Sequence, residues 1–150
     1  MEYPELTKFC LEEQNKDYEG ACFSISQSTF RSRLAKLTPK KKGYFVAFWE
    51  KNNLNTNQAF SYEKSPDYLI ISIIDGDKTG QFIFPKDLLK QQKILRTEAQ
   101  KGKMAIRVYP SWEFDLNSTA SNTQKWQTPY FIDLSQGSDI KKFKELYKKG

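Results

Sequence analysis

Seven basic side chains lie within residues 29–51, a stretch that holds a single acid. The segment therefore carries a charge of +6, which equals the net charge of all 150 residues. Its cations are Arg31, Arg33, Lys36, Lys40, Lys41, Lys42 and Lys51, and they alternate with aromatic residues that include Trp49. Ordered cations can meet several phosphates at once, and neighbouring rings can stack on bases, so the pattern favours nucleic-acid binding. A solvated basic face that only aids solubility is the alternative.

A second candidate cluster comes from two short segments, RVYPSW and TQKWQ. They supply Arg107, Tyr109, Trp112, Gln124, Lys125 and Trp126. Flat rings beside charged and hydrogen-bonding groups suit base recognition, and they equally suit a small-molecule or protein-interaction pocket. Thr38, in the turn of the basic segment, adds a neutral phosphate contact. Core packing is the competing interpretation for both tryptophans, because tryptophan is usually a packing residue.

Carboxylates offer a third kind of chemistry, since Glu19, Glu50 and Asp67 could hold Mg²⁺ in a nuclease. Asp67 follows a proline and opens an apolar segment, as the first acid of a PD-(D/E)xK nuclease does. No (D/E)xK tripeptide follows at a sensible distance, and Gln81 stands where the second acid belongs. We therefore expect no cofactor and assign no metal site, with Mg²⁺ required only under this nuclease alternative.

Composition excludes several other classes. The chain has no histidine, which rules out Ser-His-Asp and Cys-His catalysis and histidine-bound zinc. Its two cysteines are expected to be reduced thiols in a cytoplasmic protein, with a bridge between them as the alternative. No apolar run approaches the length of a membrane span, so we expect no membrane insertion.

The elements that position these groups follow from periodicity and turn residues. Helices are predicted at 4–15, 86–95, 116–127 and 138–149. Extended segments are predicted at 18–26, 30–37, 44–51, 67–75, 81–85, 104–110 and 128–133, with 67–75 as a buried central strand. Pro39 and Gly43 bound a turn at 38–43, and Asp75 and Asp77 are interpreted as turn formers.

This order predicts one domain over residues 1–150 of the α+β (mixed α/β) class, with a curved central mixed β-sheet flanked by helices. It is also similar to the core of restriction-endonuclease-like folds. That likeness concerns the fold alone and implies no activity.

Taken together, the segments RLAKLTPKKKGYFVAFW, GQFIFP, RVYPSW and TQKWQ resemble the MepB-like family over nearly the whole chain. The family is named after a protein encoded beside a multidrug efflux pump and a MarR-type repressor. The resemblance implies bacterial origin, cytoplasmic location and a regulatory or stress role near an efflux system, and it names no catalytic residue.

The expected function is therefore nucleic-acid binding, with DNA favoured as the partner, by a protein that is more a binder than an enzyme. The degenerate nuclease and the aromatic pocket for a small molecule or protein stay open as alternatives. The sequence leaves the oligomeric state undetermined.

Overall fold

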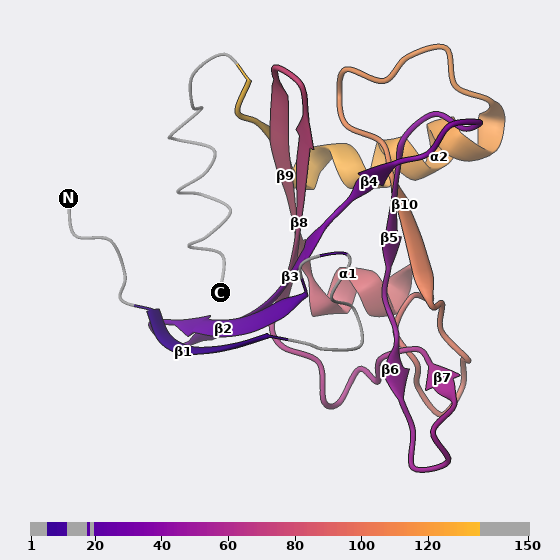
Figure 1. The fold of residues 1–150 in the computed structure, drawn as a ribbon. Helices are drawn as coiled ribbons and strands as arrows, with labels where there is room; N and C mark the ends of the chain where they lie inside the picture. Colours follow the sequence, from indigo (N-terminus) through magenta and orange to yellow (C-terminus); the bar gives the residue numbers. More distant parts are fainter. Residues whose placement is uncertain (1–5, 12–17, 19, 136–150) are drawn as a thin grey trace.

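The computed structural model describes residues 6–11, 18 and 20–135, and the architecture is mixed α/β with strands dominating (Figure 1). The largest sheet has six strands in the order β1-β2-β3-β8-β9-β11. These are β1 (Leu6–Leu11), β2 (Ala21–Ile25), β3 (Ser28–Leu34), β8 (Tyr68–Asp75), β9 (Lys78–Pro85) and β11 (Phe131–Asp133). The β3–β8 pair is parallel and the other pairs are antiparallel, so the sheet is mixed, as predicted. The apolar segment 67–75 forms β8, which lies inside the sheet and confirms the central strand.

A second sheet has three strands in the order β10-β5-β4, namely β10 (Ala105–Val108), β5 (Tyr44–Ala47) and β4 (Lys36–Leu37). Only Ala35 separates β3 from β4, and its N–H donates to the carbonyl of Ser72 at 2.9 Å. One extended segment thus belongs to both sheets, and Figure 1 shows it crossing from the large sheet to the small one. The short strands β6 (Glu50–Lys51) and β7 (Asn57–Gln58) form a separate hairpin.

Two helices complete the described part of the chain. The first, α1 (Lys86–Gln91), follows Pro85 and carries Asp87 in its first turn, as the sequence predicted. The second, α2 (Ser118–Gln127), begins after Asn117, whose side-chain oxygen accepts the N–H of Ala120 at 2.8 Å. A 3₁₀ turn over Thr128–Tyr130 then leads into β11.

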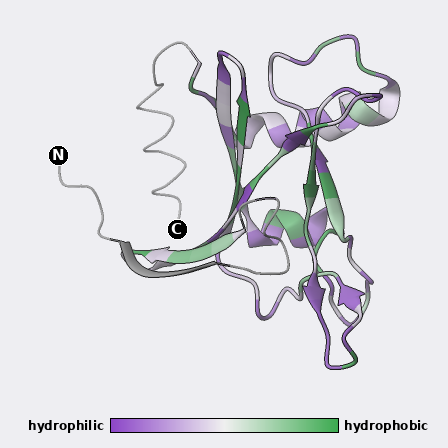
Figure 2. Cartoon of the chain, in the orientation of Figure 1, coloured by the Kyte–Doolittle hydropathy of each residue, from purple (hydrophilic) through white to green (hydrophobic). Residues whose placement is uncertain are grey.

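The main core lies between the two sheets. Alternate residues of β5, Tyr44 and Val46, point inward and are followed by buried Phe48, because side chains of a strand alternate between its faces. They meet the inward residues of β8 and β9 together with parts of α1, β10 and β11. A smaller cluster lies on the other face of the large sheet, formed by Phe30, Tyr68, Ile70, Ile83 and Ile132. Figure 2 shows hydrophobic colours recurring along β5 and β10 and hydrophilic colours on the β6–β7 hairpin.

The prediction of a helix at 4–15 is wrong where the structure describes it, because Leu6–Leu11 is strand β1. Its apolar spacing suits a strand as well as a helix, and antiparallel pairing with β2 decides between them. The β1–β2 register places Cys10 opposite Cys22. The other residues of that predicted helix and the helix predicted at 138–149 lie outside the described residues, and the restriction-endonuclease-like core stays a prediction.

Within the described residues, no helix is both long and apolar enough to cross a bilayer.

Candidate functional site

The first half of the basic segment faces the protein interior. Arg31 and Arg33 share one side of β3, as their spacing predicted, but that side faces Phe60. The Cζ atoms lie 3.7 Å (Arg31) and 5.7 Å (Arg33) from the centre of the Phe60 ring. Arg33 is 1% exposed and donates from Nη1 to the carbonyl of Ser32 at 3.0 Å. The expectation that it contacts phosphate on an open face is therefore corrected: Arg33 is a core residue that stacks on rings.

The second half of the segment faces solvent at the turn between β4 and β5. Lys40 and Lys41 are exposed. Lys42 is tied down, because its Nζ donates to the carbonyls of Phe114 (2.8 Å) and Asp115 (3.2 Å) and so fixes the loop before α2. Two exposed cations thus project from a turn that is itself anchored.

Three further members of the basic and aromatic set lie outside this turn. Lys36 is exposed on β4, with its Nζ 5.0 Å from the ring centre of Tyr18. Lys51 is exposed with its Nζ 5.4 Å from the ring centre of half-buried Trp49. The structure therefore spreads the cations along β4, the turn and β6 instead of pooling them.

Arg107 joins the turn to the second predicted cluster. From β10, its Nη1 donates to the Thr38 hydroxyl at 3.0 Å and to the Lys42 carbonyl at 3.1 Å. The turn also rests against Tyr109, since a Cβ on Gly43 would come within 2.8 Å of that ring. Gly43 has φ +82°, a conformation that favours glycine, so both geometry and space require this residue.

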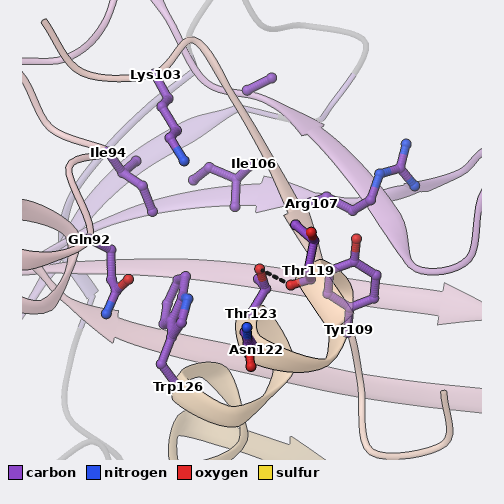
Figure 3. Close-up of a pocket in the computed structure, with 11 residues that line it drawn as sticks. Gln92, Ile94, Lys103, Ile106, Arg107, Tyr109, Thr119, Asn122, Thr123 and Trp126 are labelled. Carbon is purple, nitrogen blue, oxygen red and sulfur yellow. Dashed lines mark hydrogen bonds between the residues drawn. The ribbon is translucent and has the colours of Figure 1, made fainter. Parts of the chain in front are cut away.

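Next to Arg107 a cleft of about 460 Å³ opens between β10, α2 and the segment after α1 (Figure 3). Its charged lining residues are Lys103 and Arg107, its rings are Tyr109 and Trp126, and none of the described carboxylates lines it. The remaining side chains are neutral: Gln92, Ile94, Ala105, Ile106, Thr119, Asn122 and Thr123. A cleft with cations, rings and amides but no acid suits a planar or anionic ligand.

The helix α2 positions one wall of this cleft. Thr119, Asn122, Thr123 and Trp126 are three or four residues apart, so they share one helix face. Figure 3 shows this face directed toward β10, with the Lys103 ammonium pointing into the space between them. The Arg107 guanidinium points away from the middle of the cleft, toward the turn. Of the predicted residues, Arg107, Tyr109 and Trp126 are therefore brought together.

Sequence reasoning missed Lys103, Asn122, Thr119 and Thr123. Lys103 stands two residues before β10, in the stretch KGKM, and its proximity to the predicted strand was a usable signal. The polar residues of α2 carry no comparable signal, because Thr and Asn are common at helix surfaces and the cleft forms only when α2 packs beside β10.

Trp112 acts as a support for the core. Its Nε1 donates to the hydroxyl of Tyr44 at 3.1 Å, and that hydroxyl donates to Asp75 at 2.7 Å. Trp112 also packs edge-on against Phe131, with ring centres 5.5 Å apart. Burial of Tyr44, reinforced by its hydrogen bond to Asp75, raises the pKa of Tyr44 to about 12. Trp112 is therefore a packing residue. Asp75 stands at the hairpin turn and also accepts the hydrogen bond of the Tyr44 hydroxyl.

The two glutamines of α2 hold the walls of the cleft together. Gln124 donates from Nε2 to the carbonyls of Pro110 (3.0 Å) and Glu113 (3.1 Å), so its amide is used within the protein. Buried Gln127, which sequence reasoning missed, accepts the Tyr109 N–H at 2.9 Å and donates to the Arg107 carbonyl at 3.0 Å. Lys125 is exposed on α2 and does not line the cleft.

The carboxylates of the nuclease alternative are engaged separately. Asp67 accepts the N–H (2.9 Å) and hydroxyl (3.1 Å) of Thr29, and the Thr29 hydroxyl accepts the Asp67 N–H in return. Glu50 pairs with Arg96 at 3.7 Å. Glu19 lies outside the described residues. Within residues 6–11, 18 and 20–135, no three His, Cys, Asp or Glu side chains gather in a metal-binding arrangement.

Comparison with known proteins identifies the family of the chain. The MepB-like family model matches residues 12–133. A crystal structure of MepB superposes with a TM-score of 0.85 at 49% sequence identity, and the match covers 86% of this chain and 87% of that one. Comparison with curated protein sequences returned no match. The family match includes β2 to β11, and with them the turn, Arg107 and every residue that lines the cleft. By sequence and by fold, the chain belongs to the MepB-like family.

Proposed function

We propose that the protein binds nucleic acid, with DNA as the favoured partner, through the turn–cleft surface: the turn Thr38–Gly43, Arg107 and the residues that line the cleft. The observation that carries the proposal is the position of Arg107. It lines a cleft that contains rings and also donates to two groups of the basic turn. Phosphate-binding and base-binding chemistry are therefore adjacent.

Charge supports this assignment. Lys40 and Lys41 are exposed at one end of the surface, Lys103 points into the cleft, and the described lining residues include no acid. A phosphate backbone that runs from the turn into the cleft would meet four cations, Lys40, Lys41, Lys103 and Arg107. A fifth cation, Lys125, is exposed on α2 next in sequence to the cleft residue Trp126. About five neutralised phosphates give a slope of about −4 in a plot of log affinity against log salt on duplex DNA.

A second candidate function rests on the cleft alone. A volume of about 460 Å³ with Tyr109 and Trp126 in its walls suits one planar small molecule, such as an aromatic drug carried by an efflux pump. Lys103 and Arg107 favour a neutral or anionic molecule over a cationic one. Quenching of tryptophan fluorescence by such an aromatic pump substrate, without any response to DNA, would favour the second candidate.

The primary test is fluorescence anisotropy with labelled DNA over a salt series. The double variant Lys40→Gln/Lys41→Gln removes two exposed charges whose ammonium groups make no hydrogen bond or ion pair with the described residues. We expect it to weaken binding severalfold and to reduce the magnitude of the salt slope by about 2, one for each lost phosphate contact. A control with the same loss of charge, Lys64→Gln/Lys86→Gln, changes residues in the loop before β8 and at the start of α1, away from the turn (Figure 1). Lys86 is half-buried with its Nζ 4.8 Å from the Tyr62 ring centre, so urea unfolding of this control checks its stability.

Equal losses in the two double variants would contradict the proposal, because they would show that only net charge matters. Absence of binding at low salt would also contradict it. The same samples, incubated with Mg²⁺ and analysed on a denaturing gel, test the nuclease alternative. Cleavage that disappears in Asp67→Asn would establish that alternative instead.

Cytoplasmic location and a regulatory or stress role beside an efflux system belong to the same proposal. A DNA-binding protein encoded near a pump and a repressor would act where the chromosome and its transcripts are accessible.

A further inference from the structure

The three-stranded sheet has one face turned toward the core and one turned away from it. On β5 the inward residues are Tyr44 and Val46, so Phe45 and Ala47 point outward. Strand register places Lys36 of β4 and Arg107 of β10 directly beside Phe45, on either side. Paired residues of neighbouring strands project to the same face of a sheet. The outer face therefore carries a ring on its central strand with a cation on each flanking strand.

The contacts on this face agree with the register. The Arg107 Cζ lies 5.9 Å from the centre of the Phe45 ring. The ring of Tyr18 meets Phe45 edge-on, with centres 6.1 Å apart, and the Lys36 ammonium lies 5.0 Å from the Tyr18 ring centre. Phe45, Tyr18 and Arg107 are half-buried and Lys36 is exposed, so both rings and both cations keep some contact with solvent.

Next to Phe45 the outward side chains are small, since the following pair across β5 and β10 is Ala47 and Ala105. Phe48 is buried, and its N–H donates to the Met104 carbonyl at 2.9 Å just beyond the strand end. Extending the alternation of β5 past Phe48 assigns Trp49 to the outer side. Trp49 is half-buried, with the Lys51 ammonium 5.4 Å from its ring centre. Two rings, each near a cation, are thus separated along the chain by Ala47.

We propose that this outer sheet face is a stacking platform for single-stranded nucleic acid, in which bases stack on Phe45 and Trp49 while Lys36, Arg107 and Lys51 contact phosphates. The proposal rests on the proposed function and deepens it, because Arg107 belongs both to this platform and to the turn–cleft surface. The bases of a duplex are stacked and paired, so an aromatic ring on a sheet gains nothing from them. Unpaired bases offer their faces to such a ring.

A comparison of probes with and without bases separates ring stacking from charge attraction. The probe is a labelled thymidine oligonucleotide, compared by anisotropy with an abasic oligonucleotide of equal length that keeps the phosphates, and with a duplex of equal length. Phe45→Leu removes the ring but keeps an apolar side chain, and Phe45→Tyr keeps the ring. Trp49→Leu and Trp49→Phe repeat the comparison at the second ring, so the test does not depend on the folding of a single variant.

The wild-type protein should bind the thymidine strand about a hundredfold more tightly than the abasic strand, about tenfold for each of the two base stacks. Phe45→Leu should reduce that difference about tenfold by weakening only the thymidine complex, and Phe45→Tyr should restore it. Duplex affinity should be unchanged by Phe45→Leu.

Two results would overturn the platform while leaving the proposed function in place. One is equal affinity of the wild-type protein for the thymidine and abasic strands, with Lys40→Gln/Lys41→Gln still weakening both. The other is a loss in Phe45→Leu that is equal for thymidine, abasic and duplex probes. Failure of the wild-type protein to bind any of the three probes at low salt would instead contradict the proposed function itself, and the platform with it.

Discussion

Arg33 on β3 is 1% exposed, whereas Lys40 and Lys41 in the following turn are exposed, although all three belong to one basic segment. The strand half of the segment is β3, which lies inside the large sheet between β2 and β8, so one of its sides faces the core. Its arginines lie on that side, with their Cζ atoms over the ring of Phe60. The turn half leaves the sheet and is held by Arg107 and Lys42, while Lys40 and Lys41 stay exposed. Similar charge is thus packed against rings in one half and exposed to solvent in the other.

Replacing Arg33 with alanine should have the largest effect on stability. The change removes a fully buried side chain from above Phe48 and Phe60 and leaves a cavity, so we expect a loss of about 3 kcal/mol in the free energy of unfolding. Urea unfolding measures it. DNA affinity of the folded fraction should be unchanged. A variant as stable as the wild type but deficient in DNA binding would place Arg33 with the turn lysines and remove the contrast between the two halves.

Gly43→Ala should have the next largest effect on stability, because it strains the backbone where the turn joins β5. Alanine would occupy a backbone at φ +82° and bring its Cβ to 2.8 Å from Tyr109 and from the carbonyl of Val108. We expect a loss of about 2 kcal/mol in the free energy of unfolding. Gly76→Ala is a matched control, since its φ is also positive (+63°) but nothing lies within 4 Å of the added Cβ. Equal losses at both positions would show that backbone strain, and not the contact with Tyr109, holds the turn.

Tyr44→Phe tests the two hydrogen bonds that join Trp112, Tyr44 and Asp75. The variant leaves the Trp112 indole N–H and the Asp75 carboxylate without their shared hydroxyl, so we expect a loss of about 1.5 kcal/mol in the free energy of unfolding near neutral pH. Trp112 fluorescence should shift with it. Val46→Ala serves as a comparison, because it removes inward packing from the same strand without removing a hydrogen bond.

The raised pKa of Tyr44 predicts how the stability difference between the wild type and Tyr44→Phe depends on pH. In the folded state the pKa is about 12, against about 10 when unfolded, so the folded protein holds this proton more tightly. The contribution of Tyr44 is complete below pH 10 and is lost as the pH rises toward 12. The stability gap between wild type and Tyr44→Phe should therefore narrow over that range in unfolding experiments. A gap that stays constant from pH 9 to pH 11.5 would contradict the assignment.

Lys40→Gln/Lys41→Gln should have the smallest effect on stability, below about 0.5 kcal/mol, because both side chains are exposed. The contrast with Arg33→Ala is then sharpest: one change affects folding and spares binding, and the other affects binding and spares folding. Urea unfolding and anisotropy on the same preparations compare the two. A marked destabilisation by the lysine changes would indicate that the turn is part of the folded frame and not a free surface.

Much of this architecture was readable from local pattern. The apolar run Tyr68–Asp75 is long, β-branched and bounded by turn residues, so its place inside a sheet followed from composition. The helix predicted at 116–127 is confirmed as α2, Ser118–Gln127. The strand Leu6–Leu11 was missed, because six residues with mixed spacing fit either period and only pairing with β2 decides.

The candidate site was only partly readable. Arg107, Tyr109 and Trp126 were identified as a group by residue type, and the cleft brings them together. Lys103 and Asn122 were not identified, because their relevance depends on how α2 packs beside β10. Trp112 and Gln124 were included with the binding residues, yet their polar groups are used within the protein.

By itself the sequence determined the family, the mixed α/β class, the high local charge of residues 29–51 and the turn at Pro39–Gly43, since each depends on residues close together in the chain. Tertiary structure alone decided which cations face solvent, because two arginines of identical charge and regular spacing turn inward only when Phe48, just after β5, and Phe60, just after β7, lie against them. It also decided that β10 and α2 form a cleft and that β5 presents a ring between two cations. Those arrangements require contacts between segments far apart in sequence, which no local pattern specifies.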